Sequence, residues 1–117
     1  MAKYEATIRG HRLAEVRAVI EKEILHGSVS ASLEDVSDFE ENGSVCSVRV
    51  FERYSWIGGN RVSLSVTLFQ GAGNENVHLS AIASGGSQAM FFKINTFGES
   101  AFLDVLIRGA EQLKQNN

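Results

Sequence analysis

The pattern of hydrophobic and polar residues changes near the start of the chain. Every second residue from Tyr4 to Ile8 is apolar, and this alternation predicts a strand with one buried face. After Gly10 the apolar residues recur at intervals of three and four, which predicts an amphipathic helix. The buried stripe of this helix is Leu13, Val16, Ile20 and Ile24. Gly27, which follows His26, predicts a left-handed stop at the end of the helix.

From Ser28 to Asn95 the pattern predicts five antiparallel strands joined by hairpins. The turn signals are Asn42-Gly43, Ile57 to Asn60, Gly71 to Asn74 and Gly85-Gly86. Because a slip of one residue turns every side chain of a strand over, loop length tests whether the strands share a core face. Loops of two, three, four and two residues give one such face. It pairs Phe39 with Cys46, Tyr54 with Leu64, Leu68 with Val77 and Leu79 with Phe92. Five residues are predicted to be buried on it: Tyr54, Leu64, Val66, Leu79 and Phe92.

A second helix is predicted to close the chain. Thr96 and Glu99 have capping-box spacing, so we expect the helix to begin there. Its apolar stripe is Phe102, Val105, Leu106, Ala110 and Leu113. Gly109 lies on this stripe and would permit a close approach to the sheet.

These elements predict an α+β fold of order β-α-β5-α, with residues 1–117 forming a single domain. Both helices are expected on one face of a curved antiparallel sheet, because two amphipathic stripes need one apolar surface to cover. The order resembles a reduced helix-grip fold. That resemblance implies a place for a small apolar ligand between the sheet and the closing helix. The residues expected to line such a pocket are Tyr54, Trp56, Phe92 and Phe102.

The other face of the predicted sheet mixes large apolar side chains with basic ones. A solvated sheet face is usually more uniformly polar, so this mixture predicts a contact surface, and we expect a homodimer. The predicted interface residues are Arg49, Phe51, Arg53, Phe69, Phe91 and Lys93, with Ile82 also pointing outward. Glu34 or Asp38 would serve as rim partners for the bases. The alternative is that curvature or a different register buries some of these phenylalanines.

Charge and composition narrow the possible functions. The chain has 14 acidic and 11 basic residues and a net charge of −3, which argues against nucleic acid as a partner of the mixed face. A single cysteine excludes an internal disulfide, and the histidines at the ends of the first helix lie too far apart to share a metal. No segment is apolar enough to span a bilayer or to act as a leader, so we expect a cytoplasmic protein. No cofactor is expected.

Catalytic signals are weak. His78 is predicted to lie near several hydroxyl side chains on the mixed face, and a Ser/His pair can make an activated nucleophile. A solvated strand face rich in Ser and Thr gives the same pattern, and no oxyanion-hole motif accompanies it. The acidic run from Asp35 to Glu41 lacks the ligand order of a calcium loop and is typical of a charged hairpin tip.

Two segments, GGSQAMFFKINTFGESAFL and FERYSWIGGNRVSLSV, resemble a family of small bacterial domains of unknown function. The resemblance covers most of the chain from Ser28 to Leu106, and its characteristic segment reads GGSQAxFFKINTFGE. It implies no reaction and assigns no functional residues. The sequence therefore favours a non-catalytic interaction module that self-associates through the exposed sheet face. A carrier of a small apolar ligand is the alternative, and an enzyme of unknown type is third.

Overall fold

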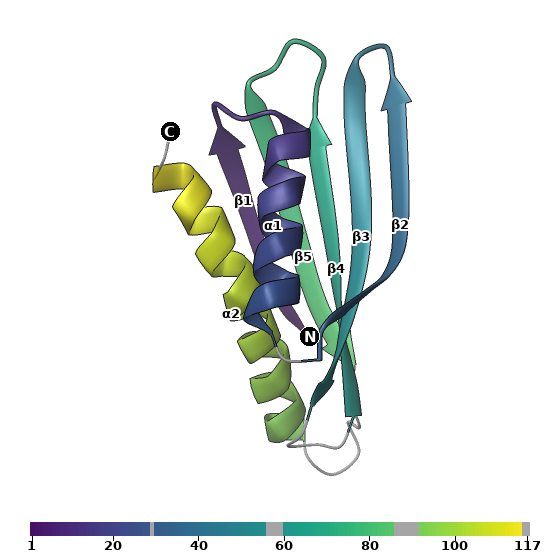
Figure 1. Ribbon diagram of the computed structural model, residues 1–117, viewed down its shortest axis with the longest axis vertical. Helices are drawn as coiled ribbons and strands as arrows, with labels where there is room; N and C mark the ends of the chain where they lie inside the picture. Colours follow the sequence, from purple (N-terminus) through teal and green to yellow (C-terminus); the bar gives the residue numbers. More distant parts are fainter. Residues whose placement is uncertain (29, 56–59, 86–91, 116–117) are drawn as a thin grey trace.

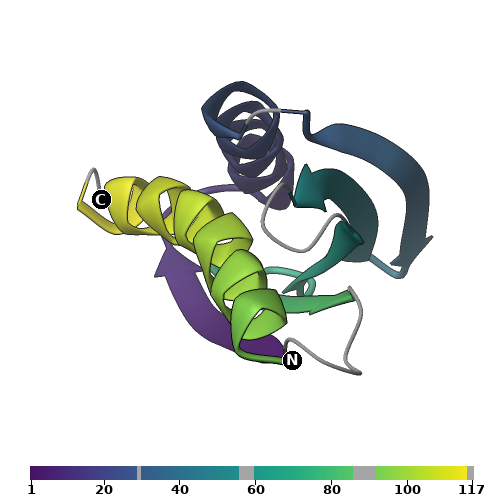
Figure 2. The same ribbon diagram turned by 90° about the horizontal axis from the view of Figure 1, so that it is seen from below.

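The computed structural model describes residues 1–28, 30–55, 60–85 and 92–115, of which 55, 60 and 92–101 are described by their backbone alone. In chain order the elements are β1 (Ala2–Arg9), α1 (Leu13–Gly27), β2 (Ser32–Glu41), β3 (Ser44–Ser55), β4 (Asn60–Gln70), β5 (Asn76–Gly85) and α2 (Phe92–Gln115). The five strands form one antiparallel sheet in the order β1-β5-β4-β3-β2. Both helices lie on one face, and the sheet curves around them (Figures 1 and 2). The predicted α+β class is confirmed, with one strand fewer than expected.

The first strand and the first helix follow their predicted patterns. Ile8 of β1 is fully buried, and the four stripe residues of α1 are buried against the sheet. Burying each such aliphatic side chain contributes about 1.5–3 kcal/mol, so this stripe fixes which side of α1 faces the sheet. The core also takes residues from β4, β5 and α2, among them Leu64, Val66, Leu68, Val77, Leu79, Phe102 and Leu106.

The hairpin between β2 and β3 turns where the sequence predicts. Glu41 pairs with Ser44 and Phe39 with Cys46 across the Asn42-Gly43 tip. Both tip residues have positive φ, 52° and 88°, which suits a tight hairpin turn and explains the glycine. Further along, a bulge at Glu34 shifts the register by one residue, because Leu33 pairs with Phe51 while Asp35 pairs with Val50.

The predicted core face of β3 is wrong. Phe51, rather than Tyr54, pairs with Leu64, and Phe51 is fully buried while Tyr54 is 41% exposed. The ladder between β3 and β4 ends at the pair of Ser55 and Asn60, so four residues connect the strands instead of three. That extra residue changes the parity and turns the whole of β3 over.

Between β4 and β5 the predicted face is right but the pairing is displaced. Leu68 pairs with Leu79 instead of Val77, a shift of two residues that leaves every side chain on its predicted face. Leu64, Val66 and Leu79 are accordingly buried together.

The predicted last strand, which would have followed a Gly85-Gly86 turn, is wrong. The position beside β5 is taken by β1, whose Ile8 pairs with Val77. The chain from Phe92 onward is helical, so α2 begins a full turn before the predicted capping box at Thr96. Residue 86 and the predicted strand residue Met90 lie outside the described residues, and the side chain of Phe92 is not described.

Where the two helices meet, a glycine of each helix packs against side chains of the other. A Cβ on Gly109 would lie 2.9 Å from Glu23 Cγ, and a Cβ on Gly27 would lie 3.0 Å from Val105 Cγ1. Gly109 therefore permits a close approach to α1, not to the sheet as predicted. Helix α1 ends at Gly27 as predicted, but Gly27 is not left-handed; Ser30 has the positive φ instead.

Candidate functional site

The face of the sheet opposite the helices, which we call the outer face, carries exposed apolar side chains. Phe39, Phe69 and Ile82 are 61%, 44% and 39% exposed on it. Phe39 pairs with Cys46, and Cys46 pairs with Phe69, so three neighbouring strands contribute to one row. The outer apolar patch consists of Phe39, Cys46, Val48, Val50, Phe69 and Ile82. Scattered single apolar residues are normal on a surface, but a connected set indicates a contact area.

The structure separates the predicted interface residues. Phe69 points outward as predicted, but Phe51 is fully buried beneath the helices, because β3 is turned over. Arg49 and Arg53 lie on the same inward-facing side of β3 as Phe51. Phe91 lies outside the described residues, and Lys93 belongs to α2, with its side chain not described.

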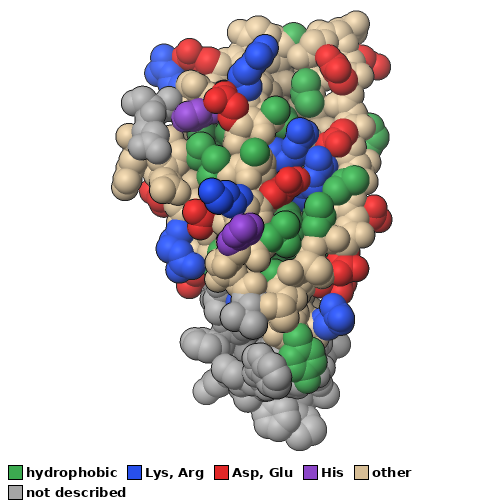
Figure 3. Space-filling model, in the orientation of Figure 1, with side chains coloured by type: hydrophobic (Ala, Val, Ile, Leu, Met, Phe, Trp, Pro, Cys, Tyr) green, Lys and Arg blue, Asp and Glu red, His purple; other side chains and the backbone are tan. Residues whose placement is uncertain are grey.

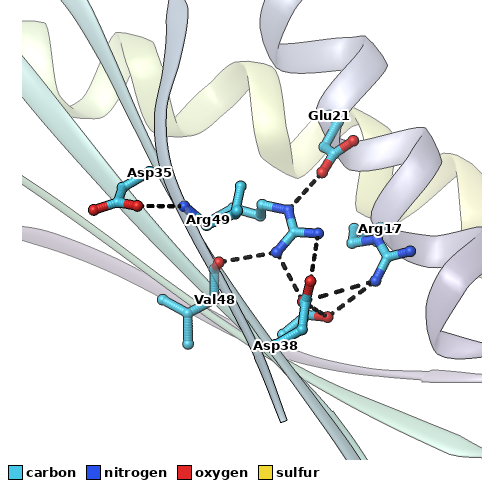
Figure 4. Close-up of polar contacts among 8 residues, drawn as sticks. Arg17, Glu21, Asp35, Asp38, Val48 and Arg49 are labelled. Carbon is cyan, nitrogen blue, oxygen red and sulfur yellow. Dashed lines mark hydrogen bonds and ion pairs between the residues drawn. The ribbon is translucent and has the colours of Figure 1, made fainter.

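Arg49 stands at the centre of a polar cluster between α1 and the β2–β3 hairpin (Figure 4). Its Nε donates to Glu21 Oε2 at 2.7 Å, and its Nη1 donates to Asp38 Oδ1 at 2.8 Å. Ser47 donates to the same oxygen of Asp38 at 2.6 Å, and Arg17 Nη1 donates to Ser47 Oγ at 3.1 Å. Arg49 is only 8% exposed, and its charge is compensated by two carboxylates. Asp38 thus lies on the helix side, not at the rim of the outer face.

These contacts also stabilise the charged forms. The hydrogen bond from Arg49, followed by that from Ser47, lowers the pKa of Asp38. The hydrogen bond to Asp38 raises the pKa of Arg49 above its already high ordinary value. Two bases and two acids balance, so the cluster attaches β2 and β3 to α1 and has no spare charge for a ligand. In the space-filling view, basic and acidic side chains gather between α1 and the β2–β3 hairpin (Figure 3).

The residues predicted to line a ligand pocket do not come together. Tyr54 lies on the outer face, whereas Phe102 is fully buried on the helix side. The Arg53 guanidinium lies over the Phe102 ring, 5.1 Å from its centroid, and donates to Ser28 Oγ at 2.8 Å. Burial lowers the pKa of Arg53. Trp56 lies outside the described residues, and the side chain of Phe92 is not described.

His78 lies on the outer face with a hydroxyl beside it. Its ring is stacked against Phe69 with centroids 6.5 Å apart, and its Nδ1 is 3.3 Å from Thr7 Oγ1. A shallow hollow here is lined by residues of β1, β4 and β5, including Thr7, Thr67, Phe69, His78 and Ser80. Catalysis would also need a group that orients the imidazole and donors that stabilise a developing oxyanion. The described contacts of His78 are with the ring of Phe69 and with the hydroxyl of Thr7.

A second shallow hollow, at the end of the sheet near the start of α1, has the amide of Gln70 fully engaged, whereas His11 Nε2 is buried without a hydrogen-bond partner among the described residues. Gln70 Oε1 accepts a hydrogen bond from the Leu13 amide at 2.9 Å, so the first turn of α1 is capped from β4. Gln70 Nε2 donates to the carbonyls of His11 and Asn74 at 3.2 and 3.0 Å. This side chain therefore joins the β1–α1 connection to the β4–β5 loop and satisfies backbone groups of both.

Within the described ranges, no group of three or more His, Cys, Asp and Glu residues is arranged to hold a metal ion. No helix in the described part of the chain combines the length and hydrophobicity needed to cross a membrane.

A model described as a family of unknown function, DUF6054, matches residues 1–114. The chain belongs to the DUF6054 family. Neither the curated proteins nor the solved structures contain a significant match. The match agrees with the predicted resemblance to a family of unknown function and extends beyond Ser28 and Leu106 at both ends. The region matched by the DUF6054 family therefore includes β1, which completes the sheet beside β5.

Several residues that matter in this DUF6054 chain were not predicted from its sequence. Phe39 and Cys46 were expected to face the core, yet they begin the outer row. Glu21 carried no signal as a partner of Arg49, because a helix pattern does not show which strand its polar edge will meet. Gln70 likewise carried no signal, because a polar residue at the end of a strand is common. Whether the β3–β4 loop has an odd or an even number of residues was the signal that could have assigned the correct buried side to β3.

Proposed function

We propose that this DUF6054 chain is a non-catalytic interaction module that self-associates through the outer face of its sheet. The observation that carries the proposal is the outer apolar patch, in which Phe39 and Phe69 are exposed in one row with Cys46 between them. Aromatic side chains at the centre of a contact supply much of its affinity because they bury a large apolar area.

The size of the outer face is compatible with this role. Five strands about 4.8 Å apart and eight residues rising about 3.3 Å each give a face of roughly 600 Å² before side-chain relief is counted. A standard interface buries about 800 Å² on each partner. The net charge of −3 is small enough for two copies to meet at physiological salt, where exposed charges are screened.

The carrier alternative has less support. A ligand between sheet and closing helix would need Tyr54 and Phe102 on one side of the sheet, and they lie on opposite sides. An enzymatic role would need more than the Thr7 and His78 contact to assemble a reaction site.

Sedimentation analysis of the full chain at micromolar concentration tests self-association. We expect a wild-type dimer and a folded Phe69→Glu monomer, because that charge would be repeated at the centre of a symmetric contact. Val36→Glu is the matched control, since Val36 is 50% exposed but lies on the helix side of β2, paired with Arg49. A monomeric wild type would overturn the proposal, as would equal loss of the dimer in both variants.

A further inference from the structure

The strand register places opposite charges at the two edges of the outer face. One row crosses the sheet from Asp35 on β2 through Val50, Ser65 and Ile82 to Lys3 on β1. The acid and the base therefore stand at opposite ends of the same row. Apolar Val50 and Ile82 hold the two intermediate positions, and Ser65 on β4 is at the middle.

The charges repeat at the far end of the sheet. Glu41 lies two residues beyond Phe39 on β2, and Arg9 lies two residues beyond Thr7 on β1. The row of Phe39 runs through Cys46, Phe69 and His78 to Thr7. The outer face thus has the acids Asp35 and Glu41 on its β2 edge and the bases Lys3 and Arg9 on its β1 edge, where Glu5 lies between the two bases. Strand β4 is halfway between the two edges (Figure 1).

We infer that two copies pack outer face to outer face about a two-fold axis that runs along β4. This inference rests on the proposed self-association and specifies its geometry. Rotation about that axis places β2 of one copy over β1 of the other. Asp35 then faces Lys3 of the second copy, Glu41 faces Arg9, and Val50 faces Ile82.

The apolar groups match in the same arrangement. Phe69 lies on the axis and meets its own copy, and Phe39 reaches the second copy at Thr7, beside the hollow of Phe69 and His78. A protruding ring facing a shallow hollow is the self-complementarity that an isologous contact requires. Because the sheet curves around its helices, the outer faces approach most closely at β4 (Figure 2). The long side chains of Lys3 and Arg9 suit the wider separation at the edges.

The other two-fold arrangement with aligned strands is electrostatically unfavourable. An axis across the strands would place β2 over β2 of the second copy, which brings the acids Asp35 and Glu41 onto an equally acidic edge. Continuation of the sheet through two β2 edges meets the same repulsion, and the bulge at Glu34 interrupts the edge ladder.

Charge reversal at the Asp35 and Lys3 positions tests the axis. Lys3 is preferred over Arg9 because its ion pair with the exposed Glu5, at 3.9 Å, is looser than the ion pair of Arg9 with Glu75, at 2.6 Å. We expect Lys3→Glu and Asp35→Lys each to weaken its own dimer about tenfold, since each creates two like-charge contacts. Mixed together, the two variants regain both opposite-charge contacts, and native mass spectrometry should find the heterodimer in excess of the statistical proportion.

A control mixture of two variants distinguishes the effect of facing charges from the effect of net charge. Lys3→Glu mixed with Asp104→Lys has the same net charges, but Asp104 is exposed on α2, on the helix side of the molecule. We expect no heterodimer preference from this pair. Equal preference in both mixtures, or none in either, would overturn the axis while leaving self-association standing.

Cross-linking gives an independent test of the same axis. In a Cys46→Ser background, which removes the single cysteine of the chain, Ser65→Cys places a thiol on β4, where it faces its own copy. Ser80→Cys places one on β5, where each thiol is displaced from its copy by about two strand spacings, roughly 10 Å. A short bismaleimide should link the first variant and leave the second largely unlinked. The reverse order would overturn the axis, and a monomeric wild type would overturn the proposed function with it.

Discussion

Arg49 Nε donates to Glu21 Oε2 at 2.7 Å, and this contact joins the middle of β3 to the middle of α1. The same guanidinium binds Asp38 on β2, so one side chain connects three elements that are separate in the sequence. Without Arg49, Glu21 would lose this ion pair, and Asp38 would keep the longer one with Arg17, at 3.8 Å.

Replacing Arg49 by Ala should therefore lower the free energy of unfolding by about 1–3 kcal/mol, which urea denaturation would measure. The cost falls short of that of a fully buried pair because Asp38 remains half-exposed. Arg61→Ala is the matched control, since Arg61 is exposed and pairs with Glu52 at 3.2 Å on the outer face. We expect less than about 0.5 kcal/mol there. Equal losses in the two variants would contradict a special role for the cluster.

The pKa of Asp38 predicts an acid-dependent contribution to stability. Its folded-state pKa lies below the ordinary value of 3.8, chiefly because of the hydrogen bond from Arg49. The stabilisation is complete above that ordinary value and is lost as the pH falls through the lower, folded-state pKa. Asp38→Asn should be less stable than wild type near neutral pH, by up to about 1 kcal/mol, and the difference should shrink below about pH 4.

Urea denaturation at several pH values would follow this difference. In an Arg49→Met background the Asp38→Asn difference should lose most of its pH dependence. A difference that stays constant down to about pH 2 would show that the carboxylate is not stabilised by its partners.

Phe51 and Phe69 form a natural comparison, because one phenylalanine is fully buried and the other is 44% exposed. Phe51→Ala should cost about 3–5 kcal/mol, which is enough to unfold a marginally stable chain. Phe51→Leu keeps the measurement possible at a cost of about 1 kcal/mol. Phe69→Ala should change the stability of the dilute chain by less than about 1 kcal/mol. The opposite ranking of Phe51→Leu and Phe69→Ala would contradict the orientation of β3.

Gly109 sets how closely the helices approach. Gly109→Val should destabilise the fold by about 1–3 kcal/mol, because the new side chain would meet Glu23 and Ile20 of α1. Gly109→Ala has opposing effects, since alanine favours a helix by about 1 kcal/mol while its Cβ crowds Glu23 Cγ at 2.9 Å. A Glu23→Ala background removes the Cγ contact and leaves the Cβ of residue 23 at 3.3 Å, so Gly109→Ala should then raise the thermal midpoint. A fall in that background would show that the contact with Glu23 Cγ is not what limits the approach.

The elements that could be predicted from sequence are those with a strong pattern of their own. The alternation in β1 and the stripe of α1 each fix a buried face without knowledge of any partner, and the Asn42-Gly43 turn fixes its own hairpin. The faces of β4 and β5 followed from loop parity even though the pairing slipped by two residues.

The pattern of β3 misled because its more apolar side is the one that faces outward. Val48 and Val50 alternate with Arg49 and Phe51, and a strand inspected alone favours the valines as the buried side. The structure buries the other side because Glu21, Asp38 and Ser28 compensate the two arginines. Those partners come from elsewhere in the chain, so no local pattern reveals them. For the same reason the outer apolar patch was predicted only in part. Phe69 and Ile82 were expected to point outward, whereas Phe39 was expected to face the core.

The end of the sheet was misjudged for a different reason. The alternating residues before Thr96 suit a strand as well as a helix, and short apolar runs do not distinguish the two. The sheet position beside β5 is filled by β1 from the other end of the chain, a long-range pairing that the local pattern does not encode.

The ten residues of β2, Ser32–Glu41, include none that is buried, and their ladder runs to β3 alone. Such a strand contributes little to the cooperative unfolding of the whole chain and can detach while β4, β5 and both helices stay folded. In native-state hydrogen exchange, the β2 amides should therefore exchange through a low-energy local opening, much faster than the amides of β4 and β5. Arg49→Ala should further increase the exchange rates of the β2 amides. The slowest β4 amides should change only as far as the global free energy of unfolding changes.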